Sequence, residues 1–215
     1  MSVIFRTVLP GLAVLLLLAA PALHAEQKNP DQVIRQAMKN ITERVEKERK
    51  KVENDDGYAR KVVEEELGDL VDFRRVTRAV MGEHFGQASR EQRNEFMETF
   101  RKSLLDTYAS GIALYEGQRW DVPSLDDGDI RGNRARVRMN FRTGDGNVVS
   151  VVYSMIDNNG DWQVENVIVN NLNLGQVFRS QFAQSVREHG GDLDKVISNW
   201  AGDMEDEDPL EDGEA

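Results

Sequence analysis

Few residues of this chain combine the types and the spacing that enzyme chemistry requires. The two histidines beyond the N-terminal segment, His84 and His189, stand in polar turn contexts, so both are expected at the surface. The sequence contains no G-x-S-x-G, H-E-x-x-H or P-loop pattern, and these patterns mark nucleophilic, zinc-dependent and phosphoryl-transfer chemistry. We therefore expect a protein that is not an enzyme, with no catalytic residue, no metal site and no cofactor.

Two loops rich in glycine and acidic residues imitate ligand-binding motifs. The stretch TGDGNVV at 143–149 has glycines spaced as in a phosphate loop, but it separates two strand-like segments, as a hairpin turn does. The stretch DNNGDW at 157–162 offers oxygen ligands in alternation, yet the twelfth position of this calcium-like loop is Ile168, where a bidentate glutamate is required. Both stretches are therefore predicted to be turns.

A row of arginines is the clearest charged feature in the middle of the sequence. Arg134, Arg136 and Arg138 alternate with apolar residues, and Arg142 continues the row. Such a row either attracts an anionic surface or an acidic partner, or is the solvated face of a sheet. Nucleic acid is disfavoured as a partner because the chain has a net charge of −11 and lacks surface aromatic residues interleaved with this row.

The two ends of the chain differ in composition from the middle. An apolar run follows Arg6, and small residues lead up to Ala25, which is typical of a signal peptide over residues 1–25. Because the run is shorter than the ~20 residues of a membrane span, a soluble, exported protein is expected. Residues 26–202 are expected to form one domain, held without cysteine. Residues 203–215 carry eight carboxylates, which predicts a disordered acidic tail.

Amphipathic periodicity predicts the helices of the first half. Asn29 and Pro30 are typical of the start of a helix, which is predicted to run to about residue 52. The second half of this helix is expected to be mostly exposed. Two short helices are expected after the break at 55–57. A capping box of Ser89 and Gln92 then opens a long helix. Its wide apolar stripe comprises Phe96, Met97, Phe100, Leu104, Leu105, Tyr108, Ile112 and Tyr115.

From residue 117 the apolar period changes to two. The segments QRWDV, RARVRMNFRT, VVSVVYSMI and WQVENVIV predict antiparallel strands with one apolar and one polar face. Two helices follow, at about 175–189 and 192–201, separated by Gly190 and Gly191. The predicted fold class is α+β, with a curved antiparallel sheet of about four to five strands wrapped by about six to seven helices.

Two apolar surfaces of this fold are expected to face each other. The long helix contributes Phe100, Leu104, Leu105, Tyr108 and Ile112, and the sheet contributes Val137, Met139, Val149, Val151, Tyr153 and Met155. The residues alone leave two interpretations open. The surfaces form an ordinary solid core, or the curved sheet and the helices form a cone-like fold that encloses an apolar cavity of lipid size.

Two long stretches resemble the phospholipid-binding MlaC family, also called the toluene-tolerance family. VDFRRVTRAVMGEHFGQASREQRNEFMETFRKSLLDTYA resembles the family's Asp-Phe helix, Met-Gly stop, Ala-Ser cap and Thr-Tyr-Ala helix. DWQVENVIVNNLNLGQVFRSQF resembles its run of Trp-x-Val, Leu-x-Leu and Arg-Ser-Gln-Phe. Phe178 stands where the family usually has tyrosine, and Asn170-Asn171 stand where Glu-Gly is common. The resemblance covers roughly residues 70–200.

The resemblance implies a periplasmic carrier that holds one phospholipid by its acyl chains in an internal apolar cavity. Such a carrier shuttles the lipid between the outer membrane and an inner-membrane ABC transporter, which maintains outer-membrane lipid asymmetry. Its implied partners are the phospholipid, the transporter complex with its periplasmic lipid-binding subunit, and an outer-membrane lipoprotein-porin complex. The expected lipid-binding residues are the two surfaces named above together with Val76, Val80, Val167, Val169, Leu174, Phe178 and Phe182.

Three points stay open at this stage. Strand alternation does not decide whether Val164 shares a face with Val167 and Val169. A hydrolase or isomerase of similar cone shape would need an acid or a histidine at the cavity floor, and no apolar face in the sequence clearly offers one. An adaptor that binds no lipid would dock through its arginine row.

Overall fold

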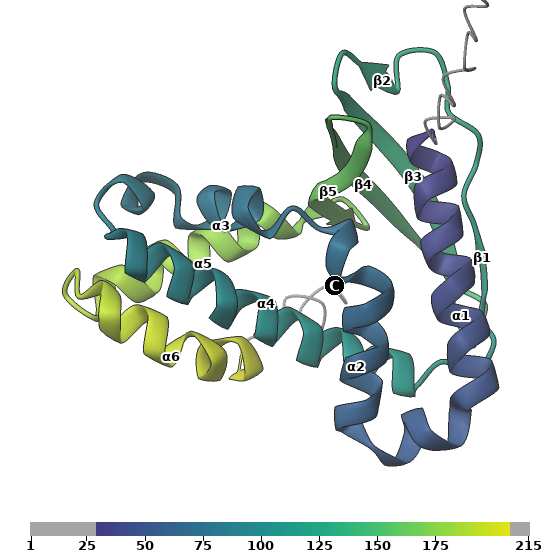
Figure 1. Cartoon of the computed structure of the whole chain (residues 1–215), viewed down its shortest axis with the longest axis horizontal. Helices are drawn as coiled ribbons and strands as arrows, with labels where there is room; N and C mark the ends of the chain where they lie inside the picture. Colours follow the sequence, from purple (N-terminus) through teal and green to yellow (C-terminus); the bar gives the residue numbers. More distant parts are fainter. Residues whose placement is uncertain (1–28, 207–215) are drawn as a thin grey trace, which may run out of the picture.

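The structure is a computed structural model that describes residues 29–206, with side chains described as far as Trp200. The predicted signal peptide and most of the predicted acidic tail lie outside the described residues. Within 29–206 the chain forms six α-helices, two short 3-10 helices and six strands (Figure 1). The helices are α1 (Pro30–Asn54), α2 (Asp56–Leu67), η1 (Gly68–Leu70), α3 (Phe73–Met81), η2 (Gly82–Gly86), α4 (Arg90–Ala113), α5 (Leu174–Glu188) and α6 (Leu193–Asp206). The strands are β1 (Arg119–Asp121), β2 (Ile130–Arg131), β3 (Arg134–Arg142), β4 (Val148–Asn158), β5 (Asp161–Val169) and β6 (Leu172–Asn173).

All six strands belong to one antiparallel sheet, which confirms the α+β fold class. Their order is β1-β3-β4-β5-β6, and β2 also pairs with β3. The four predicted strands are present, and the two-residue strands β2 and β6 are additional. Each of these strands is only two residues long, which is too short to show the alternation of apolar and polar residues that predicts a strand.

Tight turns connect the neighbouring strands. The β3–β4 turn at 143–147 is closed by backbone hydrogen bonds. The β4–β5 turn has positive φ angles at Asn159 (59°) and Gly160 (103°), and the β5–β6 turn has them at Asn170 (46°) and Asn171 (70°). Two-residue hairpin turns need positive φ, which glycine and asparagine tolerate best. The two motif-like stretches are therefore turns, as predicted, and the Asn170-Asn171 pair suits its place.

The sheet has one apolar and one polar face. In the register of β3 with β4, Val137 lies opposite Tyr153, and Met139 lies opposite Val151. Residues directly opposite in an antiparallel pair project from the same face. The buried side chains of β3 alternate with its exposed arginines, so the predicted assignment of faces is confirmed.

The polar face carries the arginine row, part of which is neutralised. Arg138 donates to both carboxylate oxygens of the buried Asp129, at 2.9 and 3.0 Å. Arg134 forms an ion pair of 3.2 Å with Glu165. Among the described residues, no carboxylate pairs with Arg136 or Arg142. The outer face is therefore a mixture of ion pairs and solvated guanidinium groups.

The helices begin and end close to the predicted residues. Ser89 accepts a hydrogen bond from the Gln92 backbone at 3.1 Å, and Gln92 accepts one from the Ser89 backbone at 2.9 Å, which is the predicted capping box. The second half of α1 is mostly exposed, as predicted, and its two buried residues, Val45 and Val52, pack against α2 and α4. At the other end, α6 continues to Asp206, beyond the expected start of the tail.

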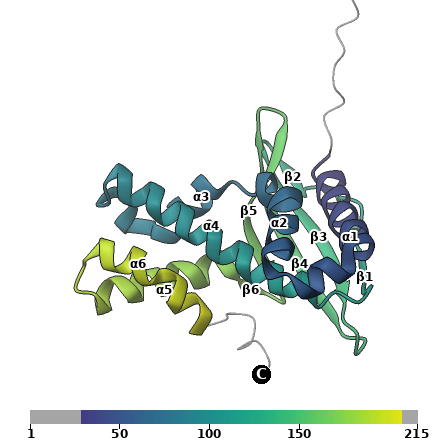
Figure 2. The same cartoon turned by 60° about the horizontal axis from the view of Figure 1, so that its bottom comes forward.

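The apolar interior consists of three clusters. Figures 1 and 2 show α3, α5, α6 and the first half of α4 grouped together, while α1 and α2 stand beside the sheet and α4 connects the two parts. The helical cluster is centred on Val80, Phe96, Phe100, Phe178, Phe182 and Trp200. The sheet cluster is centred on Ile34, Ala135, Val137, Met139, Met155 and Val164. The α1–α2 cluster is centred on Ile41, Val45, Val52, Val62, Val63 and Leu105.

Candidate functional site

The inner face of the sheet includes apolar side chains that are only half-buried, although they point toward the helices. We call this set the sheet wall; it comprises Val149, Val151, Tyr153, Val167 and Val169. The register pairs Val151 with Val169 and Tyr153 with Val167, so these four residues project from one face. By contrast, the neighbouring Val137, Met139 and Met155 are fully buried in the sheet cluster.

A β-bulge explains how β5 presents a continuous apolar face. The register of β4 with β5 shifts between Ser154 and Met155, so that Met155 pairs with Val164 while Tyr153 pairs with Val167. A bulge inserts one extra residue into a strand and reverses the alternation beyond it. Val164 and Val167 therefore share a face in spite of their odd spacing, which settles the orientation that alternation alone left open.

The long helix α4 presents a matching strip of accessible apolar residues. Leu104, Tyr108 and Ile112 recur every four residues, and they form what we call the helix wall. Leu104 and Ile112 are half-buried, and Tyr108 is 42% exposed. Leu104 borders the helical cluster together with Val167 and Val169, so the helix wall and the sheet wall approach each other at that border.

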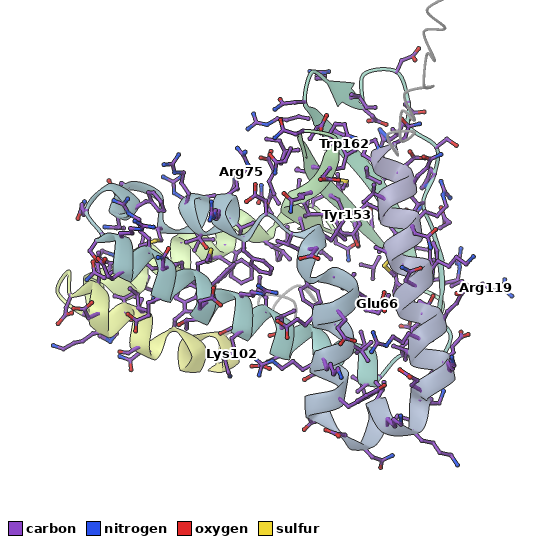
Figure 3. All side chains as sticks on the ribbon, viewed as in Figure 1. Glu66, Arg75, Lys102, Arg119, Tyr153 and Trp162 are labelled. Carbon is purple, nitrogen blue, oxygen red and sulfur yellow. The ribbon has the colours of Figure 1, made fainter. Side chains whose placement is uncertain are left out.

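Two tyrosines, one from each wall, lie near each other where the helix wall approaches the sheet wall. Burial raises the pKa of both the Tyr108 and the Tyr153 hydroxyl, and the proximity of Tyr108 raises the pKa of Tyr153 further. The Tyr153 hydroxyl also contacts the Met139 sulfur at 3.8 Å, and Figure 3 places Tyr153 where the sheet meets the helices. Tyr108 is 42% exposed and Tyr153 is half-buried, so both walls keep an accessible aromatic side chain where they approach each other.

Other predicted lipid-binding residues lie in closed parts of the interior. Phe100, Phe178 and Phe182 belong to the helical cluster, where Phe96 and Phe182 pack edge to face at 4.7 Å between ring centroids. Val80 and Leu174 are buried in the same cluster, and Val76 borders it. Leu105 is buried in the α1–α2 cluster. In this structure these side chains contact one another, and their contact with lipid stays a prediction.

A shallow hollow lies at the end of the helix wall. It has a volume of about 280 Å³ between α1, the end of α4 and β3, and its lining includes Met38, Ile41, Ile112, Tyr115 and Phe141. Only Ile112 of these belongs to the predicted lipid-binding set. The α1 residues were missed because a helical stripe shows that a face is buried and does not show what covers it. Their apolar spacing was nevertheless the signal available in the sequence.

The two histidines in the described part of the chain offer no catalytic arrangement, and each is only partly exposed. His84 is half-buried, and its ring lies 6.0 Å from the Phe182 ring centroid. His189 is half-buried at the end of α5, where its Nδ1 lies 2.9 Å from the Ser185 carbonyl oxygen. Within the described residues, no group of three or more histidine, cysteine, aspartate or glutamate side chains could hold a metal ion. No helix among residues 29–206 is long and apolar enough to cross a membrane.

Known proteins share both the sequence pattern and the fold. The toluene tolerance protein ttg2D of Pseudomonas putida is 37% identical over 139 residues, which are 64% of this chain and 64% of that protein. The intermembrane phospholipid transport system binding protein MlaC of Haemophilus influenzae is 22% identical over 180 residues, which are 82% of this chain and 75% of that protein. The chain thus spans a little under two thirds of the Pseudomonas protein.

A solved structure and a family profile complete the comparison. The phospholipid-binding protein from Ralstonia solanacearum, solved in complex with a phospholipid, is 20% identical with a TM-score of 0.70 over 81% of this chain and 99% of that chain. That likeness shows the same fold. The profile of the family described as MlaC protein matches residues 35–202, so this chain belongs to the MlaC family.

Proposed function

We propose that this protein is a carrier that binds a phospholipid by its acyl chains between the helix wall and the sheet wall. The observation that carries the proposal is the pair of apolar walls, whose side chains remain accessible although one wall lies on the inner face of the sheet and the other on α4 where it approaches that face. Membership in the MlaC family and the phospholipid in the Ralstonia protein support the same ligand.

The chemistry of the ligand explains why a carrier would need such walls. Two acyl chains contain roughly 30 methylene groups, and each contributes about 0.8 kcal/mol on leaving water, so transfer through water is opposed by about 25 kcal/mol. An interior lined by valine, leucine and tyrosine offsets most of this cost, whereas a shallow groove does not. The headgroup stays in water, because no described charged side chain belongs to either wall.

The proposal includes a location and a route. The predicted signal peptide directs the chain to the periplasm, where it moves phospholipid between the outer membrane and an inner-membrane ABC transporter and so maintains outer-membrane lipid asymmetry. Its partners are then an outer-membrane lipoprotein-porin complex and the transporter complex with its periplasmic lipid-binding subunit. The activity is transport of unchanged lipid rather than catalysis.

Native mass spectrometry of protein purified without detergent tests the proposal. We expect the wild-type protein to carry the mass of a diacyl phospholipid. Val151→Asp places a charge on the sheet wall and should remove this mass while thermal unfolding stays cooperative, because a carboxylate among acyl chains loses its hydration. Val148→Asp is the matched control on the same strand, since Val148 is 50% exposed on the polar face. Wild-type protein without lipid, or Val151→Asp with full lipid occupancy, contradicts the proposal.

A further inference from the structure

A second hollow lies where α3 packs beside α4. It has a volume of about 540 Å³ between α3, η2 and the first half of α4. We call it the arginine pocket, after Arg74, Arg75 and Arg78 of α3 and Arg90 and Arg93 of α4, which line it together with Thr77. Asp72 is the one carboxylate in its lining. The residues are separated along the chain, and only the packing of α3 beside α4 brings them together.

Four of the five arginines have no carboxylate partner within the described residues. Arg75 is paired, with its Nε 3.2 Å from Asp72 and 3.6 Å from Glu165. No ion pair involves Arg74, Arg78, Arg90 or Arg93 in the part of the chain that the structure describes. In a chain with a net charge of −11, this is a local concentration of uncompensated positive charge. Guanidinium groups gathered around one hollow repel each other unless an anion lies between them.

Hydrogen-bond donors inside the pocket also lack acceptors. Thr77 is 2% exposed, and its hydroxyl has no hydrogen-bond partner. A threonine within a helix usually donates to the carbonyl one turn earlier, and Thr77 does not. The Nε of Arg93 is likewise buried without a partner. Thr77 and Arg93, which line the pocket, thus each keep a donor for which the protein itself offers no acceptor.

An aromatic ring holds two of the arginines in place across the pocket. The guanidinium carbon of Arg78 lies 4.8 Å from the Phe85 ring centroid, and that of Arg93 lies 4.4 Å from it. A guanidinium that stacks on a ring keeps its N–H edge available for a carboxylate or a phosphate. Phe85 thus fixes one arginine from each helix before any ligand arrives, which lowers the entropy lost on binding.

We propose that the arginine pocket binds a phosphate ester. A phosphate monoester offers three terminal acceptor oxygens and close to two negative charges on one compact centre, which suits donors that converge from two helices. The pocket is larger than a phosphate group alone, and Phe85 and Met97 add apolar surface for an organic part such as glycerol. The ester is either the headgroup of a lipid or a soluble metabolite. The site is separate from the two walls, because none of its lining residues belongs to either wall.

Calorimetric titration of the full chain with glycerol 3-phosphate tests the proposal, with sodium chloride at equal ionic strength as the reference. We expect saturable binding of one equivalent. The affinity should increase between pH 5.5 and pH 7.5, because the second ionisation of the phosphate occurs near pH 6 and the arginines stay charged. Heats no larger than those of chloride would overturn the proposal. Because this probe has no acyl chain, its failure leaves the carrier proposal standing.

Two variants locate the binding within the pocket. Arg78→Gln should weaken glycerol 3-phosphate binding about tenfold or more, whereas Arg136→Gln on the polar face of the sheet removes the same charge and should leave it unchanged. Thr77→Val keeps every charge and the side-chain shape, so it should fold at least as well as the wild type and still bind severalfold more weakly. Wild-type affinity in both Arg78→Gln and Thr77→Val overturns the assignment.

Vesicle sedimentation separates the two sources of the ester. Binding to phosphatidic acid vesicles that glycerol 3-phosphate inhibits and Arg78→Gln abolishes assigns the pocket to a lipid headgroup. Glycerol 3-phosphate binding without vesicle binding assigns it to a soluble ester. Phosphatidylcholine vesicles are the neutral control. A hexaglutamate peptide that binds more tightly than glycerol 3-phosphate overturns the proposal in favour of an acidic protein segment.

Discussion

At the scale of single residues, neither of the two walls contains a charged side chain. Valine, leucine and isoleucine surround two tyrosines, and burial raises the pKa of Tyr108 and Tyr153 above its ordinary value of 10. Both phenols therefore stay neutral across the physiological range. Acyl chains have no group that could compensate a charge, so a neutral lining is what their binding requires. In the proposed function, release of the lipid would therefore depend on movement of the walls rather than on titration within them.

The ionised carboxylate of Asp72 connects the start of α3 to the sheet. Burial opposes its charge, but hydrogen bonds from the Arg75 backbone, from Asn158 and from the Arg75 guanidinium outweigh burial and hold its pKa below the usual value. The carboxylate caps α3 at 3.0 Å from the Arg75 nitrogen and lies 3.2 Å from the Asn158 amide on β4. One side chain thus ties the start of α3 to the sheet.

We expect Asp72→Ala to lower the free energy of unfolding by about 1–2 kcal/mol at pH 7, as the loss of a helix cap does. Because the folded pKa is depressed, the stabilisation is complete above the unfolded pKa of about 3.9 and is lost as the pH falls through the folded pKa. Urea unfolding at pH 7 and pH 3 should therefore show a difference from the wild type that narrows at pH 3. Asp72→Asn retains a capping oxygen and should have the smaller effect. A difference in unfolding free energy between Asp72→Ala and the wild type that is the same at both pH values would count against this account.

At the scale of elements, the corner between β6 and α5 depends on one glycine. The Asn166 amide receives a hydrogen bond from the Gly175 nitrogen at 3.0 Å and donates one to Asn173 at 3.0 Å. A Cβ at Gly175 would lie 2.5 Å from the Asn166 oxygen, closer than a real Cβ contact. The bulge in β5 and the start of α5 are therefore held together by an amide that leaves no room for a side chain.

Gly175→Ala should lower the free energy of unfolding by about 1–3 kcal/mol, because the Asn166 amide must leave two hydrogen bonds within the interior. Gly111→Ala is the matched comparison, since its Cβ would meet no atom within 4 Å. Removing a glycine from the interior of α4 should raise stability by about 0.5–1 kcal/mol. Chemical denaturation of both variants measures the change in the free energy of unfolding, which should be negative for Gly175→Ala and positive for Gly111→Ala. The same change in both variants would show that the corner is not tightly packed.

Period and capping signals account for most of the elements that could be predicted from the sequence. Ser89 and Gln92 mark the start of α4 because capping is local, and the arginines alternating in β3 reveal its polar face for the same reason. The face of Val164 could not be predicted, since a bulge depends on pairing with another strand. The burial of Val52 and the arginine pocket were missed because each depends on which helices pack together. The sequence of one helix does not show which helix lies beside it.

At the scale of the whole molecule, the interior is divided rather than continuous. The helical cluster, the sheet cluster and the α1–α2 cluster are separate groups of buried residues. Partly buried side chains such as Val167 border two of them. A solid core of this size would normally form one contiguous cluster. Separate clusters bordered by accessible walls fit the removable guest of the proposed function.

This division predicts which segments lose hydrogen-exchange protection when the lipid is removed. In hydrogen exchange on loaded and lipid-free protein, we expect residues 104–112 of α4 and 149–153 of β4 to lose protection when the lipid is removed, because the half-buried walls lose their contacts. α5 and α6 should change little, since Phe182 and Trp200 pack against each other at 5.8 Å between centroids. The melting temperature should fall as well, as it does when a ligand that binds only the folded state is removed.

The spatial pattern of the loss distinguishes a carrier from a protein with a solid core. Lipid that merely adheres to the surface would leave exchange in 104–112 and 149–153 unchanged. A uniform loss over all helices would mean that the three clusters unfold as one unit. Val151→Asp purified without lipid should reproduce the lipid-free pattern, because the same walls are then without a guest. Agreement between the two preparations would tie the accessible apolar walls to the cargo they are proposed to hold.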